Sequence, residues 1–366
     1  MHIFKTPRIL TMSRIGSYAV TAWALLLGLL GCGGGGWSGG DPITGISATN
    51  FKYGQLANLT LTGNALDNVI KLSSDKCLSV TLGAIESSSM RHATCIVAAT
   101  GPIEFTVKSN ADYTVYSTSL NAPEPVTGIN ASNLKYGQTA VLTLSGDPQI
   151  GSIKVSSDKC TGMTLDAVSS AATRTARCTV TGTGDMKLTV TNTSGGTTFY
   201  TQTVSVPEPQ VTLVTTLGTV VMELNPTAAP ITVKNFLAYV NQSPSFYNGT
   251  IFHRVLAGSV AQGGGYTSGF VAKTGQSSPI ALEVGKGLSN LQGTIAMART
   301  DVLNSATSQF FFNARDNISY DTLGGGYAVF GKIIAGLDLI IQISNLPATS
   351  DRPNTEVVIT SATQTQ

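Results

Sequence analysis

Apolar residues alternate with Thr and Ser along much of the chain, and this two-residue period predicts β-strands rather than helices. The stretches LTLT at 59–62 and LTLS at 142–145 show the alternation, as do FTV at 105–107 and LTV at 188–190. Clusters of Gly, Asn, Asp and Ser, which are typical of turns, separate these stretches. The pattern therefore predicts a mainly β protein built from many short strands.

The alternating segments occur in two copies. ITGISATNFKYGQLANLTLTG at Ile43–Gly63 returns 83 residues later as VTGINASNLKYGQTAVLTLSG at Val126–Gly146, and both copies end in Pro-Glu-Pro. Repeats of this length are tandem domains rather than turns of a solenoid, whose repeats are much shorter. We expect two small β-sandwich domains, loosely similar to immunoglobulin-type modules, at 43–125 and 126–209.

The third domain, expected at 210–366, has a different pattern. VTLVTTLGTVVMELN at 211–225 consists of two alternating segments on either side of Leu217, which predicts a β-hairpin. Helices are predicted over Thr227–Asn241, where apolar residues recur on one face behind a proline, and over Gly336–Ile343. This domain is therefore expected to be mainly β with two helices.

Composition and charge narrow the class of protein. The 366 residues are only 11% charged and are rich in Gly, which suits an exported β protein better than a cytosolic helical one. The formal net charge of +2 includes Lys5, Arg8 and Arg14 in the first 31 residues, which contain no acid. Without that segment 19 basic residues face 20 acidic ones, a net charge of −1, and no basic run remains. We therefore expect no nucleic-acid partner.

The N-terminus has the pattern of an export signal. An apolar run at Ala19–Leu30 is too short and too interrupted by Gly to be a comfortable membrane span. It leads into Leu-Leu-Gly-Cys ending at Cys32, which resembles the lipobox of bacterial lipoproteins. The resemblance implies a signal peptide at 1–31 and a lipidated Cys32 that anchors the mature chain in a membrane. An ordinary signal peptide with a chance cysteine is the alternative, and Met1 and Met12 are both candidate starts.

A glycine-rich segment follows the cysteine, GGGGWSGG at Gly33–Gly40, and residues 32–42 are expected to form a flexible tether. It lacks the GK[ST] ending of a phosphate-binding loop. Gly33 rather than Asp follows Cys32, which by analogy with lipoprotein sorting in Gram-negative bacteria favours the outer membrane. We expect a lipid-anchored protein of the bacterial cell envelope, facing the periplasm or the surface.

The remaining cysteines suggest disulfides. Five Cys less Cys32 leaves four, and an even number in an exported chain is typical of paired cysteines. Because the duplication preserves an 18-residue spacing, the expected pairs are Cys77–Cys95 and Cys160–Cys178. With no CxxC motif and no Cys/His cluster, no metal and no cofactor is expected.

Two motifs in the third domain indicate which reaction the protein could catalyse. FHRVLAGSVAQGGG at Phe252–Gly265 and SQFFFN at Ser308–Asn313 resemble the cyclophilins, the cyclophilin-type peptidyl-prolyl cis/trans isomerases, and most closely the short bacterial ones. The resemblance extends over Val211–Thr363. Further motifs of the same kind occur in this order: VKNFL at 233–237, FYNGT at 246–250, GTIAMAR at 293–299 and YAVFG at 327–331.

The resemblance implies an eight-stranded antiparallel barrel with two capping helices, and isomerisation of X-Pro bonds in proline-containing polypeptides. It assigns the role of catalytic hydrogen-bond donor to Arg254, with Gln262 orienting the arginine and the peptide. Gln309 and Phe311 stand two apart on a predicted strand and so face the same side. Their counterparts in the family line the peptide groove and the proline pocket.

Further substrate-binding positions come from the same resemblance. The expected set is Ala298, whose backbone contacts substrate, its neighbour Arg299, and the pocket residues Val260, Tyr320 and Tyr327.

Two positions depart from the family pattern. Ser259 stands where the family usually has a Phe in the pocket wall, which would weaken proline binding through lost apolar surface. Ser319 stands near the position of the cyclosporin-binding Trp of vertebrate members.

His253 precedes Arg254 on a strand and is expected to face the other way as a structural residue. Gly263–Gly265 is interpreted as a tight turn.

Two functions from different classes follow. The first is a tethered prolyl isomerase that assists the folding of exported proteins, with the sandwiches as spacer or client-holding modules. The second is a surface lipoprotein whose sandwiches bind a partner, with a cyclophilin domain that binds proline peptides but turns over poorly. The sequence does not identify the ligand of the sandwiches.

Overall fold

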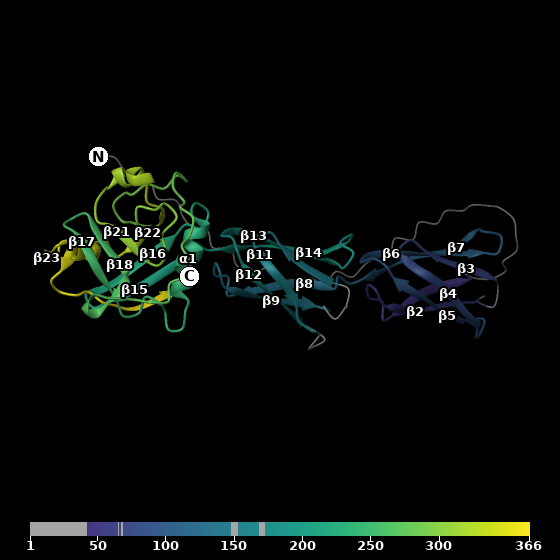
Figure 1. The fold of residues 1–366 in the computed structure, drawn as a ribbon. Coiled ribbons are helices and arrows are strands. Elements are labelled where there is room, and N and C mark those ends of the chain that lie inside the picture. The colour runs from purple at the N-terminus through teal and green to yellow at the C-terminus, as the bar shows by residue number, and fades with distance from the viewer. Residues whose placement is uncertain (1–41, 65, 67–68, 148–152, 168–172) are drawn as a thin grey trace, which may run out of the picture. The chain divides into compact units, whose positions relative to one another are not determined.

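The computed structural model describes residues 42–366 apart from 65, 67–68, 148–152 and 168–172 (Figure 1). The described chain is mainly β, as the alternation predicts, and contains two α-helices. The predicted signal peptide, Cys32 and the glycine tether lie outside the described residues. Within the described ranges no helix has the length and apolar character needed to cross a membrane.

The first repeat folds as two antiparallel sheets of four and three strands, in the orders β1-β2-β5-β4 and β3-β6-β7. Side chains from both sheets enclose one apolar core that includes Leu59 and Phe105, as alternation on two inner faces requires. The strands are β1 (Ile43–Thr49), β2 (Leu56–Gly63), β3 (Ile70–Ser74), β4 (Cys77–Ile85), β5 (Met90–Val97), β6 (Gly101–Ser109) and β7 (Thr114–Ala122).

The second repeat has the same strand orders, β11-β12-β9-β8 and β10-β13-β14, around its own core. Equivalent sequence positions therefore form equivalent strands in the two copies. The strands are β8 (Val126–Ser132), β9 (Thr139–Gly146), β10 (Ile153–Ser157), β11 (Cys160–Leu165), β12 (Thr173–Val180), β13 (Gly184–Asn192) and β14 (Thr198–Val206).

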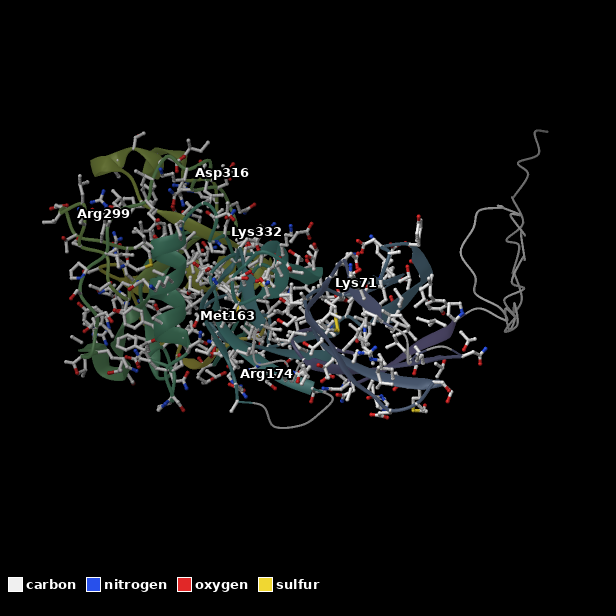
Figure 2. All side chains as sticks on the ribbon, turned by 90° about the vertical axis from the view of Figure 1, so that its right-hand side faces the viewer. Lys71, Met163, Arg174, Arg299, Asp316 and Lys332 are labelled. Atoms are coloured by element: carbon white, nitrogen blue, oxygen red, sulfur yellow. A yellow bond between two sulfur atoms is a disulfide. The ribbon has the colours of Figure 1, made fainter. Side chains whose placement is uncertain are left out.

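The outer faces of the sandwiches carry polar side chains together with exposed apolar ones, such as Leu56, Leu78 and Ile96 on the four-stranded sheet of the first copy. Lys71 on β3, labelled in Figure 2, forms an ion pair with Asp112 at 2.7 Å between two exposed side chains. Hydrogen bonding to Lys71 and its positive charge lower the pKa of Asp112. Exposed pairs of this kind contribute little to stability, so the buried cores and the disulfides hold the sandwiches together.

Each sandwich contains the predicted disulfide. Cys77 bonds to Cys95 and Cys160 bonds to Cys178, with Cα–Cα distances of 5.7 and 5.6 Å. In both copies the cysteines lie on neighbouring strands of the four-stranded sheet, β4–β5 and β11–β12, so each bond links strands within one sheet. The bond therefore reinforces the edge strand of that sheet rather than joining the two sheets.

Replacing Cys160 and Cys178 together by Ser should destabilise the second sandwich by about 3 kcal/mol, because the bond closes a loop between residues 18 apart. Hydrogen exchange of the β11 and β12 amides measures the loss, with the first sandwich of the same molecule as internal reference. Non-reducing peptide mapping checks the pairing, and a peptide joining cysteines of different sandwiches would contradict it.

The third domain is an eight-stranded antiparallel sheet in the order β17-β18-β21-β20-β22-β16-β15-β25, with β19 paired to β18. It contains the predicted hairpin, β15–β16. Its strands are β15 (Gln210–Thr215), β16 (Gly218–Leu224), β17 (Thr250–Leu256), β18 (Val260–Thr267), β19 (Val271–Ala272), β20 (Thr294–Met297), β21 (Phe310–Asn313), β22 (Val329–Ala335) and β25 (Ile359–Gln364).

The two ends of this sheet approach each other, so the sheet is a nearly closed barrel. Ile251 forms an isolated antiparallel bridge with Val358, and the amide of Phe252 donates to the carbonyl of Val357 at 3.0 Å. Closure leaves an inner face that aromatic rings fill. Phe236 of the first helix packs edge-on against Phe310 on β21, with ring centroids 5.6 Å apart.

Both predicted helices form, with shifted ends. Helix α1 (Pro230–Val240) begins three residues later than predicted because a proline, which lacks an amide hydrogen, favours the first position of a helix. The carboxylate of Glu283 then accepts hydrogen bonds from the amides of Ile231 and Thr232, at 3.1 and 2.8 Å. Helix α2 (Leu337–Ser344) begins after Gly336, whose φ of 89° excludes it from the helix.

Candidate active site

One row of residues runs across five neighbouring strands of the barrel. The Cα partners are Arg254 on β17, Gln262 on β18, Phe311 on β21, Ala296 on β20 and Val329 on β22. Residues paired across antiparallel strands present their side chains on the same face of a sheet. Three of the predicted site residues therefore lie side by side because of strand register.

Alternation along β21 separates this face from the barrel interior. Phe310 and Phe312 are fully buried in the main core of the domain. Phe311 lies between them in sequence and belongs to a second, smaller cluster with Val260 and Ala296. The row thus lies on the outer face of the barrel, where a polypeptide has access.

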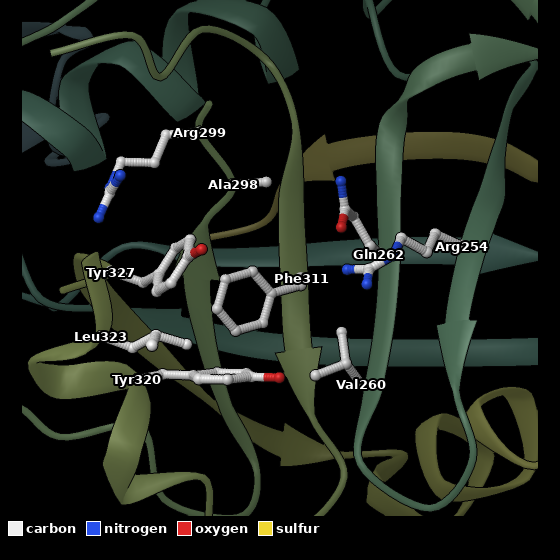
Figure 3. Close-up of a pocket in the computed structure, with 9 residues that line it drawn as sticks. All are labelled: Arg254, Val260, Gln262, Ala298, Arg299, Phe311, Tyr320, Leu323 and Tyr327. Atoms are coloured by element: carbon white, nitrogen blue, oxygen red, sulfur yellow. The ribbon is translucent and has the colours of Figure 1, made fainter. Parts of the chain in front are cut away.

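Three residues of the row, Arg254, Gln262 and Phe311, line a cavity of about 230 Å³ (Figure 3). Eight predicted site residues line it in addition to Leu323: Arg254, Val260, Gln262, Ala298, Arg299, Phe311, Tyr320 and Tyr327. Figure 3 shows the guanidinium of Arg254 reaching past Gln262 toward the ring of Phe311. The three rings of Phe311, Tyr320 and Tyr327 meet edge-on or tilted, with centroids 5.6 to 6.0 Å apart. The arrangement combines an apolar pocket with a charged donor at its edge.

Strict alternation along β17 predicts that the side chain of His253 faces away from that of Arg254. The backbone at His253 is not regular, however. The register of β17 against β18 shifts between Phe252 and Arg254, so His253 is an extra residue in a β-bulge. A bulge rotates the side chains around it. The ring Nε2 of His253 consequently lies 3.4 Å from the amide nitrogen of Gln262, within the site.

Two glutamine side chains form a chain of polar contacts beneath the cavity. The Gln262 amide nitrogen donates to Oε1 of Gln309 at 2.9 Å and faces His253 Nε2. Burial lowers the pKa of His253 to about 4, so the ring is neutral at ordinary pH, and in the tautomer protonated on Nδ1 its Nε2 accepts from Gln262. Both contacts involve the amide nitrogen of Gln262, so the Oε1 end of this amide is turned away from Gln309 and His253. Gln309 itself does not line the cavity, and its side chain is connected to it by the hydrogen bond with Gln262.

Gly263–Gly265 is not the tight turn that its sequence suggests. All three residues lie inside strand β18. A Cβ on Gly265 would lie 2.5 Å from Nε2 and 2.6 Å from Cγ of Gln309, closer than real Cβ contacts. The glycine is therefore needed to leave room for the Gln309 side chain, and its own φ lies outside the left-handed region.

Replacing Gly265 by Ala should lower catalytic efficiency about tenfold by displacing Gln309 from Gln262, since small misplacements in a site cost this much. Thermal stability should change little because the backbone at Gly265 is unstrained. Gly128→Ala is the matched control, since it adds the same methyl group where no atom lies within 4 Å. Equal activity of the two variants would contradict the role assigned to Gly265.

Arg299 braces one wall of the cavity. Its Nε donates to the carbonyl of Gly326 at 3.0 Å and its Nη2 to that of Gly324 at 2.6 Å. The guanidinium also lies over the ring of Tyr327, 4.8 Å from its centroid. The two glycines have positive φ and form a turn around the short 3-10 helix η3 (Leu323–Gly325). Arg299 thus holds the loop that contributes Leu323 to the cavity.

The position of Ser259 differs from the pocket wall implied by the family pattern. Ser259 is buried in the turn between β17 and β18 and does not line the cavity. Its hydroxyl donates to Oδ1 of Asn317 at 2.8 Å, and its carbonyl accepts from Nδ2 of the same residue at 3.0 Å. This small polar residue ties the turn to the loop that precedes η2 (Ile318–Asp321). Ser319, in η2, is exposed and does not line the cavity either.

Two residues that contribute to the site, Leu323 and Asp351, are not predicted from the sequence. Leu323 lines the cavity although it stands in a glycine-rich loop with no periodic pattern. Asp351 accepts a hydrogen bond from Nε of Arg254 at 3.2 Å, and its partner is 97 residues away in sequence. A lone acidic residue next to serine in a turn gives no signal that could have identified it.

Comparison with known proteins shows which family the C-terminal part of the chain matches. The profile of the family described as "Cyclophilin type peptidyl-prolyl cis-trans isomerase/CLD" matches residues 210–364. A peptidyl-prolyl cis-trans isomerase of Acinetobacter baylyi is 46% identical over 37% of this chain and 72% of its own length. Peptidyl-prolyl cis-trans isomerase B of Escherichia coli is 42% identical over 42% of this chain and 98% of its own length.

A solved structure is also similar, a cyclophilin type peptidyl-prolyl cis-trans isomerase of Cryptosporidium parvum. It is 26% identical and the match covers 43% of this chain and 98% of that one. Its TM-score of 0.37 is too low to support a statement about the fold.

Proposed function

The chain belongs to the cyclophilin-type peptidyl-prolyl cis/trans isomerases, and we propose that it acts as an isomerase tethered to the bacterial envelope, where it assists the folding of exported proteins. The single observation that carries the catalytic part is the row of Arg254, Gln262 and Phe311 along the outer cavity. The anchoring and the compartment rest on the N-terminal sequence and on the disulfides.

The chemistry of the site suits rotation about an X-Pro bond. Amide resonance sets a barrier of about 18–20 kcal/mol, so the unassisted reaction takes tens of seconds or more. In the twisted state the prolyl nitrogen loses conjugation and its lone pair becomes an acceptor. Arg254 supplies a permanently charged donor beside a pocket whose Phe311 face receives the proline ring. No bond is broken and no proton is transferred, so a donor and a shaped pocket suffice.

The disulfides support an exported protein. Bonds such as Cys77–Cys95 and Cys160–Cys178 persist in oxidising compartments and are rare in the cytosol. The export-type N-terminus at residues 1–31 is consistent with the same compartment. In this proposal the two sandwiches separate the isomerase domain from the membrane surface or hold clients near it.

Replacing Arg254 by Ala should leave the fold intact and lower kcat/KM for Xaa-Pro peptides about a hundredfold. A charge-assisted hydrogen bond made mainly in the transition state is worth about 3 kcal/mol, and each 1.36 kcal/mol is a factor of ten. Arg254→Lys should recover little, because one ammonium does not reproduce the forked donor. A protease-coupled isomerase assay on the mature chain measures both variants.

Arg177→Ala is the matched control for this loss. Arg177 is an exposed arginine of the second sandwich that pairs with Asp166 at 3.3 Å, as Arg254 pairs with Asp351 at 3.2 Å. Its removal should leave the activity unchanged. A folded wild-type chain without activity above background would end the catalytic proposal. The function would then pass to the alternative, a surface lipoprotein that binds partners through its sandwiches.

Replacing Cys32 by Ala should release the protein from the membrane fraction, because the thiol is the attachment point of the lipid. Cell fractionation with mass spectrometry of the mature N-terminus checks both the anchor and the start at Cys32. Separation of inner and outer membranes tests the expected outer-membrane address. A Cys32→Ala protein that stays in the membrane fraction as fully as the wild type would exclude a lipid anchor.

A further inference from the structure

A short hairpin outside the barrel ends beside the catalytic arginine. Strands β23 (Ala348–Thr349) and β24 (Arg352–Pro353) form a separate two-stranded sheet. The two residues of its turn, Ser350 and Asp351, both have positive φ, of 50° and 64°. Such a conformation is uncommon for non-glycine residues, and Asp and Asn tolerate it best. The turn therefore holds Asp351 in one defined orientation.

The tip of the hairpin is fixed to strand β17 by two consecutive residues. The amide of Val255 donates to the carbonyl of Asp351 at 2.7 Å. The preceding residue, Arg254, donates from Nε to Oδ2 of Asp351 at 3.2 Å, and its Nη2 lies 3.2 Å from the same oxygen. The backbone hydrogen bond from Val255 holds Asp351 against β17. The carboxylate of Asp351 therefore lies where the guanidinium of Arg254 can donate to it. Two of the three guanidinium nitrogens face Asp351, which leaves Nη1 for the cavity.

The other side of the hairpin is braced independently of Arg254. The guanidinium of Arg352 lies over the ring of Phe270, 4.6 Å from its centroid, and pairs with Glu356 at 3.6 Å. Hydrogen bonds from Ser268 and Gly269 lower the pKa of the Glu356 carboxyl, so this partner is charged at neutral pH. The Asp351 carboxylate is thus attached to a supported element and does not merely follow the arginine.

We infer that Asp351 is a positioning residue for the isomerase reaction, which holds the guanidinium of Arg254 so that Nη1 is directed at the prolyl nitrogen. An arginine side chain that is half-exposed, at 45%, has many rotamers available, and most of them point away from the cavity. The carboxylate selects rotamers in which the Nε edge faces the hairpin. This inference rests on the catalytic role proposed for Arg254.

The test compares Asp351→Asn with the wild type in the full mature chain. Asn accepts the positive φ of this turn, so the hairpin should form, while the neutral amide no longer makes the ion pair. We expect kcat to fall about fivefold with KM within about twofold, because the arginine contributes mainly in the transition state. Asp351→Glu, which restores a carboxylate, should recover part of kcat. Thermal unfolding verifies that the variants are folded.

Salt dependence gives a readout that a purely structural role would not change. The pair is half-exposed, and exposed charges are screened as ionic strength rises. Between about 0.05 and 0.5 M NaCl the wild-type rate should fall toward that of Asp351→Asn, whereas the rate of the variant should stay constant. Exchange spectroscopy by NMR measures both rates on one Xaa-Pro peptide.

The matched control is Glu223→Gln. Glu223 pairs with Lys332, labelled in Figure 2, at 3.2 Å on the same domain, and neither residue lines the cavity of Figure 3. An equal loss in this variant, a wild-type kcat in Asp351→Asn, or a faster Asp351→Asn would each overturn the inference. If Arg254→Ala loses activity while Asp351→Asn does not, only the inference fails. If neither loses activity, the proposed role of Arg254 fails as well.

Discussion

Strand register is the constraint on which the site depends. Arg254, Gln262 and Phe311 come from three strands, and the pairing of β18 with both neighbours places them in one row. A shift of β18 by one residue would turn Gln262 into the barrel and bring a neighbouring side chain to the outer face. The buried rings of Phe310 and Phe312 oppose such a shift, because the same slip of β21 would expose them. The core of the barrel therefore specifies the geometry of the site on its outside.

Much of this was accessible from the sequence. Alternation identifies which side of β21 Phe311 occupies, and the duplicated spacing identifies the pairs Cys77–Cys95 and Cys160–Cys178. These inferences succeed because they rest on short-range periodicity or on a repeated interval. The family resemblance adds Arg254 and Gln262, whose roles no periodicity reveals. It also predicts the barrel, which alternation alone leaves as a mainly β domain.

The failures share a physical cause, which is that each depends on geometry or contacts that exist only in the folded chain. The bulge at His253 brings its ring within 3.4 Å of the amide nitrogen of Gln262, a contact that strict alternation does not predict. Gly265 reads as part of a turn, yet it lies in strand β18, and the Gln309 side chain occupies the space that a Cβ would need. Asp351 reaches Arg254 only because two unrelated segments meet. Bulges, close approaches and long-range contacts are properties of the folded chain, and a linear pattern does not encode them.

The energetics of the arginine explain why it is both exposed and ordered. An exposed ion pair such as Arg254–Asp351 contributes about 0–1 kcal/mol, too little to bind the guanidinium away from a substrate but enough to bias its rotamers. The charge of arginine is permanent, and His253, with a pKa of about 4, stays neutral above pH 5 and keeps its contact with Gln262. The ring of His253 therefore keeps one charge state through the neutral pH range. A reaction that transfers no proton needs a fixed field rather than a titrating group, and this site provides one.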